Sequence, residues 1–268
     1  MERVTHHGRE TAYRLAGADK SGATALYVHG SGGTHRLWAH QYAPDGPTHP
    51  AVALDLSGHG ESDDIATESG PETLAAYAAD VVAVARETNA EVLVGNSLGG
   101  AVVFKILLDT TFDPDAVVFA GSGAKLAVAE ELQTALTEDF EAAVDMLHRP
   151  SMLFADPDSE LLAQSKQTMQ AVGQRVTRRD FLSCHTFDVR ERLADVAVPT
   201  LAVVGDGDRL TPPSYHEYLA ENIPDCEQRV IEGAGHLAML EAPDTFNNAL
   251  ESFLAEYDRV PDESDSYN

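Results

Sequence analysis

The chain has very little cysteine. Two cysteines occur among its 268 residues, Cys184 and Cys226, and neither belongs to a Cys-x-x-Cys pair. We therefore expect neither a disulfide framework nor a zinc ribbon, and a reducing cytoplasm is the expected compartment. We also expect no metal and no cofactor.

Long apolar runs are missing as well. No stretch of 18 or more consecutive apolar residues occurs, so the sequence predicts no transmembrane helix. The first residues, MERVTHHGRETAYRLAG, are polar and alternating without an apolar h-region, so we expect no secretory signal. With 43% hydrophobic residues the chain can nevertheless build a sizeable core, enough for one large α/β domain or a domain with an inserted cap.

Positive charge is scarce. Eighteen lysines and arginines stand against 44 acids, which gives a formal net charge of −26. Such a charge repels nucleic acids and anionic membranes at long range, so neither is an expected partner. The composition resembles that of cytoplasmic proteins from salt-loving organisms, in which concentrated salt screens the self-repulsion of the acids.

This resemblance to halophilic proteins predicts how stability depends on salt. We expect the melting temperature to rise from low to multimolar KCl, because added ions screen the repulsion between the surface acids. Thermal unfolding followed by circular dichroism across that range measures the effect. Greatest stability at low salt would contradict the halophile interpretation.

Short β-branched runs alternate with helical stretches along most of the chain, which favours βα units on a mainly parallel sheet. Near-continuous apolar runs are typical of strands that are covered on both faces. Residues 2–16 alternate instead and predict an antiparallel hairpin. The runs that predict strands are ALYVHG (25–30), AVALDL (51–56), EVLVGNS (91–97), AVVFAGS (116–122), TLAVVGD (200–206) and EQRVIEG (227–233). Helices are expected at 72–88, 98–109, 213–222 and 242–257.

One interval interrupts this alternation. Residues 124–192 show helical periodicity and no strand pattern. So long an interval cannot be a plain loop in a compact domain, and we interpret it as an inserted helical cap. The core domain then comprises residues 1–123 and 193–258. The acidic, polar residues 259–268 predict a disordered tail.

Three glycines surround one serine at the end of a predicted strand. The segment Gly95-Asn96-Ser97-Leu98-Gly99 matches the Gly-x-Ser-x-Gly pattern of a nucleophile elbow. In such an elbow the serine occupies a strained strand-to-helix turn, so that its hydroxyl projects at the carboxyl end of the sheet. The pattern is short and recurs by chance, but its position between a strand and a helix favours a nucleophile at Ser97 over a structural turn.

A serine nucleophile needs a general base, which is itself oriented by a third group. The candidate base is His236, in the segment EGAGHLAMLEAP after the last predicted strand. Asp206 and Asp208, in VVGDGDRLTP, both qualify chemically as the acid. We favour Asp208 because it lies further out on the loop, and we expect Asp206 to stabilise the turn.

The glycine-rich segment HGSGG (29–33) follows directly after the strand ALYV. A turn of this kind leaves backbone N–H groups pointing into the site, and we expect those of Ser31 and Leu98 to form an oxyanion hole. Each such donor typically contributes about 3–4 kcal/mol to transition-state stabilisation. A phosphate-binding loop is not favoured, since no Gly-Lys-Ser/Thr follows.

Together with Asp-x-x-Gly-His-Gly-x-Ser at 55–62 and Gly-x-x-Asp-x-x-x-Pro at 205–212, these motifs resemble the α/β-hydrolase superfamily. The order of the candidates along the chain, serine, aspartate, histidine, is also the order of that fold. The resemblance implies an eight-stranded, mostly parallel sheet with helices on both faces and an active site under the cap. It implies the following roles: Ser97 as nucleophile, His236 as base, Asp208 as orienting acid, and Ser31 and Leu98 as oxyanion donors.

We therefore expect a serine hydrolase that cleaves a small carboxylic ester through an acyl-enzyme. The Asn96-Ser97 pair is similar to carbon–carbon bond hydrolases of ring-cleavage products, although their oxyanion turn usually continues into Gly-Pro-Gly and this one continues GGTHRLW. A non-catalytic, ligand-binding member of the fold is a third alternative, which the complete set of candidate residues disfavours. The acyl length and the oligomeric state are not predicted.

Substrate choice is expected to depend on the cap. Aromatic side chains of the segments MLFADP and FLSCHTFD, together with the tryptophan just beyond the oxyanion turn, are candidates for an apolar acyl pocket. Packing of the cap onto the sheet explains any one of them equally well. The candidates are Trp38, Phe154, Phe181 and Phe187, with Met152 and Cys184 beside them in the same segments.

Overall fold

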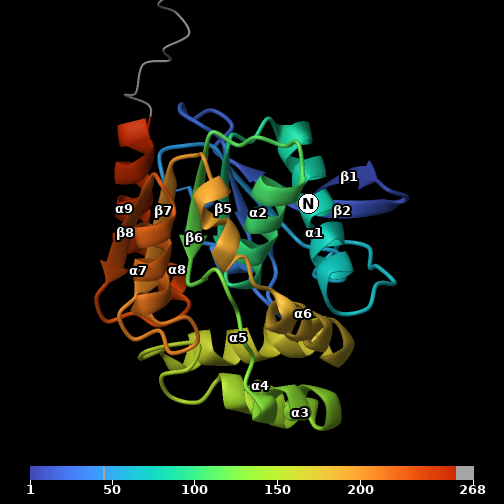
Figure 1. Ribbon diagram of the computed structural model, residues 1–268. Coiled ribbons are helices and arrows are strands. Elements are labelled where there is room, and N and C mark those ends of the chain that lie inside the picture. The colour runs from blue at the N-terminus through green and yellow to red at the C-terminus, as the bar shows by residue number, and fades with distance from the viewer. Residues whose placement is uncertain (45, 258–268) are drawn as a thin grey trace, which may run out of the picture.

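The computed structural model describes residues 1–44 and 46–257 and centres on one eight-stranded sheet of order β1-β2-β4-β3-β5-β6-β7-β8 (Figure 1). The hairpin β1–β2 is antiparallel, β2 also pairs antiparallel with β4, and the remaining neighbours are parallel. The eight-stranded, mostly parallel sheet is thereby confirmed. The strands are β1 (Glu2–His6), β2 (Arg9–Ala16), β3 (Ala25–Val28), β4 (Ala51–Leu54), β5 (Val92–Asn96), β6 (Ala116–Ala120), β7 (Thr200–Gly205) and β8 (Cys226–Ile231).

The central strands are buried along their whole length, because helices cover both faces of the sheet. Every residue of β3, β4, β5, β6 and β7 is buried. Successive side chains then enter two different cores: Leu26 and Val28 pack on one face of the sheet, and Ala25 and Tyr27 pack on the other. This arrangement explains why these strands are continuous apolar runs rather than alternating ones.

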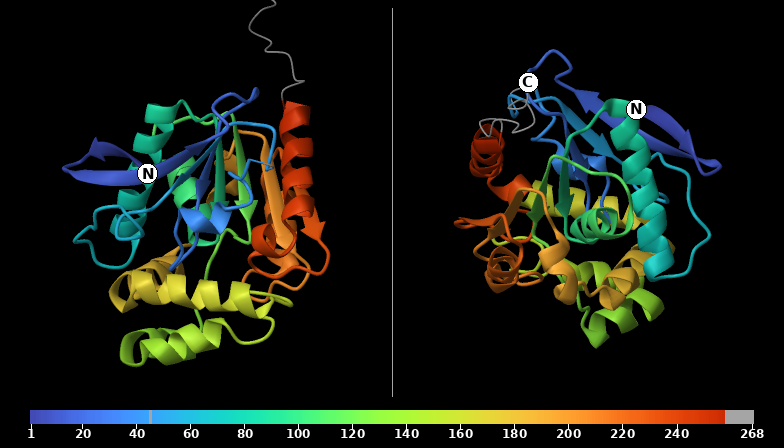
Figure 2. Two further views of the ribbon diagram at one scale, coloured as in Figure 1. Left: turned by 180° about the vertical axis from the view of Figure 1, so that it is seen from behind. Right: turned by 45° about the horizontal axis from the view of Figure 1, so that its top comes forward.

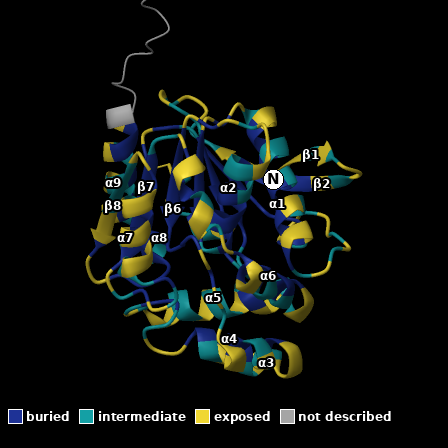
Figure 3. Cartoon of the chain, viewed as in Figure 1, coloured by how far each residue is buried: buried dark blue, intermediate teal, exposed yellow. Residues whose placement is uncertain are grey.

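Helices α1 (Pro71–Thr88), α2 (Leu98–Asp109) and α7 (Pro213–Asn222) contribute to the first of these cores. On the opposite face lie α8 (Ala238–Glu241), α9 (Pro243–Tyr257) and the short 3-10 helix η1 (His35–Trp38). The proline at the first position of α1 suits that position, where its missing N–H would have had no helical partner. Figure 3 shows the buried residues concentrated on the strands and the exposed residues on the outer helix surfaces.

The interval between β6 and β7 is a helical insertion, as predicted. It contains α3 (Glu130–Glu138), α4 (Phe140–Leu147), α5 (Ser159–Val172), α6 (Gln174–Thr186) and the 3-10 helix η2 (Arg190–Asp195). The two ends of the insertion meet, since Lys125 pairs with Asp188 in an isolated antiparallel bridge and Val189 N–H donates to Ala124 O at 2.8 Å.

Helices α3–α6 gather at one end of the sheet, as Figure 1 and the left view of Figure 2 show. The domain bounds of 1–123, 124–192 and 193–258 stay a prediction, and the predicted tail at 259–268 lies outside the described residues. Within residues 1–44 and 46–257, no helix is both long and apolar enough to cross a membrane.

Candidate active site

The turn between β5 and α2 holds Ser97 in a backbone conformation that residues other than glycine rarely adopt. Its φ is +53° and its ψ is −113°. The glycines on both sides are required by space. A Cβ on Gly95 would lie 2.5 Å from the backbone carbonyl carbon of Gly99, and one on Gly99 would lie 2.4 Å from Val28 O on the neighbouring strand. The Gly-x-Ser-x-Gly spacing is therefore a steric requirement of this strand-to-helix turn.

This close approach predicts a strong effect of substituting Gly99. We expect Gly99→Ala to lower the free energy of unfolding by at least about 3 kcal/mol, because the contact is with backbone that cannot rotate away. A matched control is Gly233→Ala, where φ is +74° but no atom lies within 4 Å of the added Cβ. That change should cost only about 1–2 kcal/mol of backbone strain. Urea unfolding measures both, and equal losses would show that crowding at Gly99 is not limiting.

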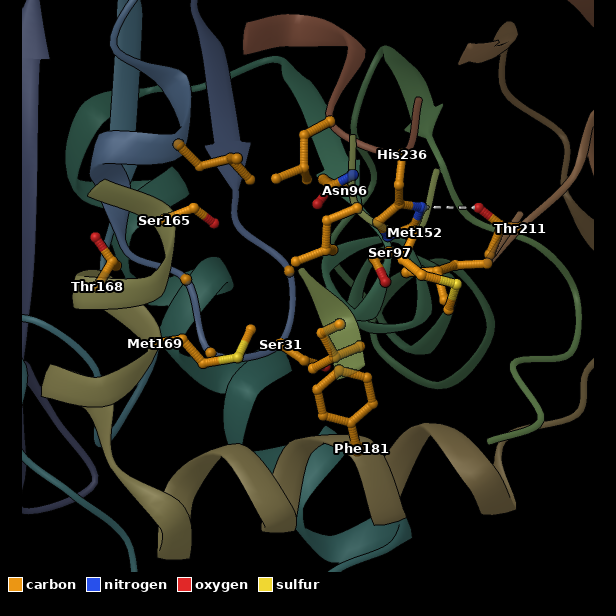
Figure 4. A pocket seen from close by; sticks show the side chains of 18 of the residues that line it. Ser31, Asn96, Ser97, Met152, Ser165, Thr168, Met169, Phe181, Thr211 and His236 are labelled. Carbon is orange, nitrogen blue, oxygen red and sulfur yellow. Dashed lines mark hydrogen bonds between the residues drawn. The ribbon is translucent and has the colours of Figure 1, made fainter. Parts of the chain in front are cut away.

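His236 is paired with Asp208 on the loops that follow β8 and β7. The two residues are each 3% exposed, and His236 Nδ1 lies 2.8 Å from Asp208 Oδ2. Asp208 also accepts hydrogen bonds from Leu210 N–H at 2.8 Å, Thr211 N–H at 2.9 Å and the Thr211 hydroxyl at 2.8 Å. The Thr211 hydroxyl lies 3.2 Å from His236 Nδ1 (Figure 4).

These contacts decide the charge of Asp208. Burial by itself would raise the pKa of the carboxyl group, but His236 and the Thr211 donors lower it below its ordinary value. The carboxylate is thus a charged acceptor that holds the Nδ1 side of the imidazole. The other ring nitrogen, Nε2, is therefore available for proton transfer.

Asp206 has a different place. It is exposed, and its Oδ1 accepts a hydrogen bond from Gly233 N–H at 2.9 Å, which ties the loop after β7 to the loop after β8. Among the described residues His236 contacts Asp208 and not Asp206. Of the two aspartates that the sequence left open, only Asp208 lies beside the imidazole.

The glycine-rich turn after β3 lies against the serine. A Cβ on Gly30 would lie 3.2 Å from Ser97 Cβ. No hydrogen bond within residues 1–44 and 46–257 uses the N–H of Ser31 or that of Leu98. The positive end of α2 also lies at Ser97, since Leu98 is the first residue of that helix. Two backbone donors are thus available near the Ser97 hydroxyl.

His29 stabilises this turn through hydrogen bonds of both ring nitrogens. It is fully buried, and burial lowers its pKa to about 4, so the ring is neutral. Its Nδ1–H donates to Gly30 O at 2.8 Å and its Nε2 accepts from Leu56 N–H at 3.1 Å. A neutral imidazole with one donor and one acceptor satisfies both contacts.

Ser97, Ser31 and His236 line a single cavity of about 580 Å³ between the core turns and the helical insertion. Figure 4 shows the side chains of Ser97, His236, Met152 and Phe181 around this space. In the described part of the chain no hydrogen bond joins the Ser97 hydroxyl to His236. Such catalytic hydrogen bonds often form only in the complex with substrate.

The insertion supplies a lining that the sequence only partly indicated. Phe181, Met152 and Cys184 line the cavity, and so do Met146 and Met169, which the sequence analysis missed. Methionine side chains are flexible and polarisable, so they adapt to ligands of different shape.

The cavity-facing surface of α5 was also missed. Its residues recur with helical spacing, but several of them are polar. Apolar periodicity therefore does not identify this surface. The residues of α5 that line the cavity are Leu161, Gln164, Ser165, Gln167, Thr168 and Met169.

The structure corrects the expectation for three of the four aromatic candidates, which pack into the interior and do not line the cavity. Trp38 is fully buried with its ring centroid 5.0 Å from that of Tyr27 and 6.0 Å from that of Phe246. Phe187 packs on the ring of Phe104 at 6.1 Å, and Phe154 packs on that of His148 at 6.4 Å. The physical reason is that each of them lies at a junction between the insertion or η1 and the core, where burial of the ring is complete or nearly so.

Known proteins of similar sequence and fold identify the family of the chain. A sequence profile described as the Alpha/beta hydrolase family matches residues 25–249. The structure of a thermophilic esterase is similar, with a TM-score of 0.83 and 32% sequence identity, over 96% of this chain and 97% of that one. Est816, an N-acyl homoserine lactone degrading enzyme, is 27% identical, with a TM-score of 0.82 over 94% of this chain and 100% of that one.

A carbon–carbon bond hydrolase is also among the relatives. The 2-hydroxy-6-oxo-6-(2'-aminophenyl)hexa-2,4-dienoic acid hydrolase of Metapseudomonas resinovorans is 26% identical over 267 residues, which are 94% of this chain and 90% of that protein. None of these comparisons supports the predicted halophilic source, which stays a prediction with the salt test described above.

The profile match extends from β3 into α9 and so includes the elbow, both loops that carry Asp208 and His236, and the helical insertion. The similarity to the thermophilic esterase covers nearly the whole of both chains. The chain therefore belongs to the α/β hydrolase family and is an esterase-like enzyme of that family rather than a non-catalytic member of the fold.

Proposed function

We propose that the enzyme hydrolyses a small carboxylic ester through an acyl-enzyme formed on Ser97. The observation that carries the proposal is the convergence of three distant segments at one cavity: Ser97 on the elbow, His236 held at 2.8 Å by Asp208, and the turn that contains Ser31. Nucleophile, oriented base and backbone donors are the parts that acyl transfer requires.

The first half of the reaction forms the acyl-enzyme. His236 Nε2 takes the Ser97 proton as Oγ attacks the ester carbonyl carbon, and the carbonyl π electrons move onto oxygen. The N–H groups of Ser31 and Leu98 donate to that oxyanion. When the tetrahedral intermediate collapses, the C–O bond to the alcohol breaks and His236 Nε2–H protonates the leaving oxygen.

The second half releases the acid. His236 takes a proton from water, the resulting hydroxide oxygen attacks the acyl carbon, and the bond to Ser97 Oγ breaks as that oxygen regains the proton. In both halves the charged Asp208 stabilises the imidazolium and keeps Nε2 directed at the reacting atoms.

The proposal is tested with a fluorophosphonate probe and a panel of p-nitrophenyl esters and lactones that vary in acyl length. We expect one label per chain, mapped by peptide mass spectrometry to Ser97, together with turnover of at least one ester. Labelling of a folded enzyme at another residue, or no turnover across the panel in low and in high salt, would refute it.

Carbon–carbon bond hydrolysis is the second candidate, and Asn96 is the residue that favours it. Its Nδ2 donates to Ala120 O at 3.0 Å, and its Oδ1 lies beneath Gly30, where an added Cβ would approach it to 2.7 Å. Asn96 also lines the cavity, and a relative that hydrolyses a dienoic acid shares 26% of its sequence with this chain. Loss of the absorbance of a ring-cleavage dienoate, faster than hydrolysis of any ester, would favour this alternative.

The cavity lining also predicts a selectivity effect at Phe181. We expect Phe181→Ala to raise the ratio of kcat/KM for long over short acyl esters by about tenfold, because the removed ring leaves room for additional methylene groups. Phe187→Ala is the matched control, since that ring packs in the core. It should cost about 3–5 kcal/mol of stability and leave the ratio unchanged. A ratio that changes equally in both variants would contradict the assignment of Phe181 to the acyl pocket.

A further inference from the structure

A fully buried carboxylate of the insertion contacts the oxyanion turn. Asp180 lies on α6 and is 0% exposed. Its Oδ2 accepts from Gly32 N–H at 3.1 Å and lies 2.9 Å from His59 Nε2, and its Oδ1 accepts from the Tyr77 hydroxyl at 2.7 Å. All three partners belong to the core, so one side chain of the insertion is bound to three separate segments of the domain beneath it.

The contact with Gly32 lies next to the proposed oxyanion donor. Gly32 directly follows Ser31, whose N–H is the proposed oxyanion donor, and its φ is +67°. One internal bond, from Gly33 N–H to Gly30 O at 3.1 Å, closes the turn. The Asp180 bond fixes the peptide between Ser31 and Gly32 from outside, and thereby restrains the ψ angle of Ser31.

The rest of this surface of α6 packs on the same turn. Cys184, one helical turn after Asp180, has its Sγ 3.9 Å from the Ser31 hydroxyl oxygen. A Cβ on Gly32 would lie 3.0 Å from Met169 Cγ of α5 and 3.3 Å from Thr177 Cγ2 of α6. The turn is therefore enclosed by the insertion, with Asp180 as the acceptor for its Gly32 N–H.

A carboxylate so near an oxyanion hole would oppose the negative charge of the transition state unless it were neutralised. Burial disfavours charge on both members of the His59–Asp180 pair. Even so, the carboxylate keeps the pKa of His59 above its ordinary value, and His59 with the other donors keeps the pKa of Asp180 below its own. Both shifts favour the ion pair, in which the imidazolium of His59 balances the charge of the carboxylate.

We propose that Asp180 is a positioning residue for ester hydrolysis, in which its carboxylate holds the Gly30–Gly33 turn so that Ser31 N–H points at the developing oxyanion. The inference rests on the proposed function, because it needs Ser31 as an oxyanion donor. If so, α6 must be packed correctly on the core for catalysis itself, and not only to enclose the substrate.

The test must separate positioning from a purely structural tether. Tyr77→Phe is the matched control, because it removes the hydrogen bond to Oδ1, together with two that Arg179 donates to the same hydroxyl, and leaves the bond from Gly32 to Oδ2. We expect Asp180→Ala to lower kcat by about 100-fold with KM changed less than about threefold, the signature of a lost transition-state interaction. The affinity for a trifluoromethyl ketone, whose adduct with Ser97 mimics the oxyanion, should fall by the same factor. Tyr77→Phe should keep both within about threefold even where its melting temperature falls.

Two further variants keep the test decisive. Asp180→Asn retains a carbonyl that can accept from Gly32 N–H and loses only the acceptor of the Tyr77 hydroxyl, so it should recover most of kcat. If Asp180→Ala does not fold, the double variant His59→Leu/Asp180→Leu replaces the buried pair with apolar groups, which is often neutral for stability. It should show the same loss of kcat and of ketone affinity.

The outcomes are distinguishable. A folded variant without the carboxylate that keeps wild-type kcat and ketone affinity, or that loses no more of either than Tyr77→Phe, would overturn the role of Asp180. Failure of the proposed function shows differently, because the wild-type enzyme itself would then neither hydrolyse esters nor bind the ketone.

Discussion

Ser97→Ala is expected to lower kcat for p-nitrophenyl esters by at least about 10⁴-fold while the fold stays intact. The hydroxyl lines the cavity and makes no hydrogen bond to another described side chain, so its removal leaves no buried group without a partner. The positive φ of +53° strains alanine no more than serine. Single-turnover and steady-state assays measure the loss, and circular dichroism checks the fold.

Ser165→Ala is the control for this substitution. Ser165 lines the same cavity from α5, and its hydroxyl oxygen lies 2.9 Å from His148 Nε2, away from the proposed chemistry. We expect kcat within about threefold of wild type, because no transition-state contact is removed. Ester turnover by the Ser97→Ala protein near the wild-type rate would end the assignment of the nucleophile.

Asp208→Asn should be the second large effect, a loss of about 10³–10⁴-fold in kcat. Both oxygens of this carboxylate accept hydrogen bonds: two from backbone N–H groups at Oδ1, and one from the Thr211 hydroxyl with His236 Nδ1 beside it at Oδ2. An amide has only one acceptor oxygen, so its NH₂ group must face either the backbone N–H groups or the Nδ1–H of His236. The imidazole then loses its orientation and its preferred tautomer.

Asp206→Asn is the matched control, two residues away on the same loop. Among the described residues, its one side-chain hydrogen bond is the one that it accepts from Gly233 N–H at 2.9 Å, which an amide oxygen reproduces. We expect activity within about threefold of wild type and a small change in melting temperature. The reverse ranking of the two variants would exchange the roles that we propose for these aspartates.

Some features of the molecule follow from neighbouring residues, and others depend on contacts between distant segments. The elbow pattern is local, because its residues lie within five positions of the chain and Gly95 is required by the backbone of Gly99 in the same turn. Gly99 is required in addition by the backbone of Val28 on β3. The continuous apolar runs of the central strands are local too, and so is the helical insertion, since the segments of α3, α4, α5 and α6 each carry a helical pattern. These patterns repeat over a few residues, so they can be recognised in the chain before it folds.

The lining of the cavity could not be found in that way. Phe181 and Phe187 are six positions apart in one segment, yet one ring lines the cavity and the other packs against Phe104. The difference depends on which side of α6 packs against α2. The two residues are both phenylalanine, so the residue type cannot predict it. The same holds for Ser165 and Thr168, whose polarity concealed their place on the inner surface of α5.

By itself the sequence determined the family, the mainly parallel sheet, the helical insertion and the small set of candidate residues, because each depends on the period, spacing or backbone demands of neighbouring positions. Only the tertiary structure decided that Asp208 and not Asp206 lies beside His236, and that Asp180 reaches Gly32 across 148 positions of the chain. Contacts of this kind form where separate loops and helices meet. Their partners are chosen by the packing of whole elements, which local pattern does not record.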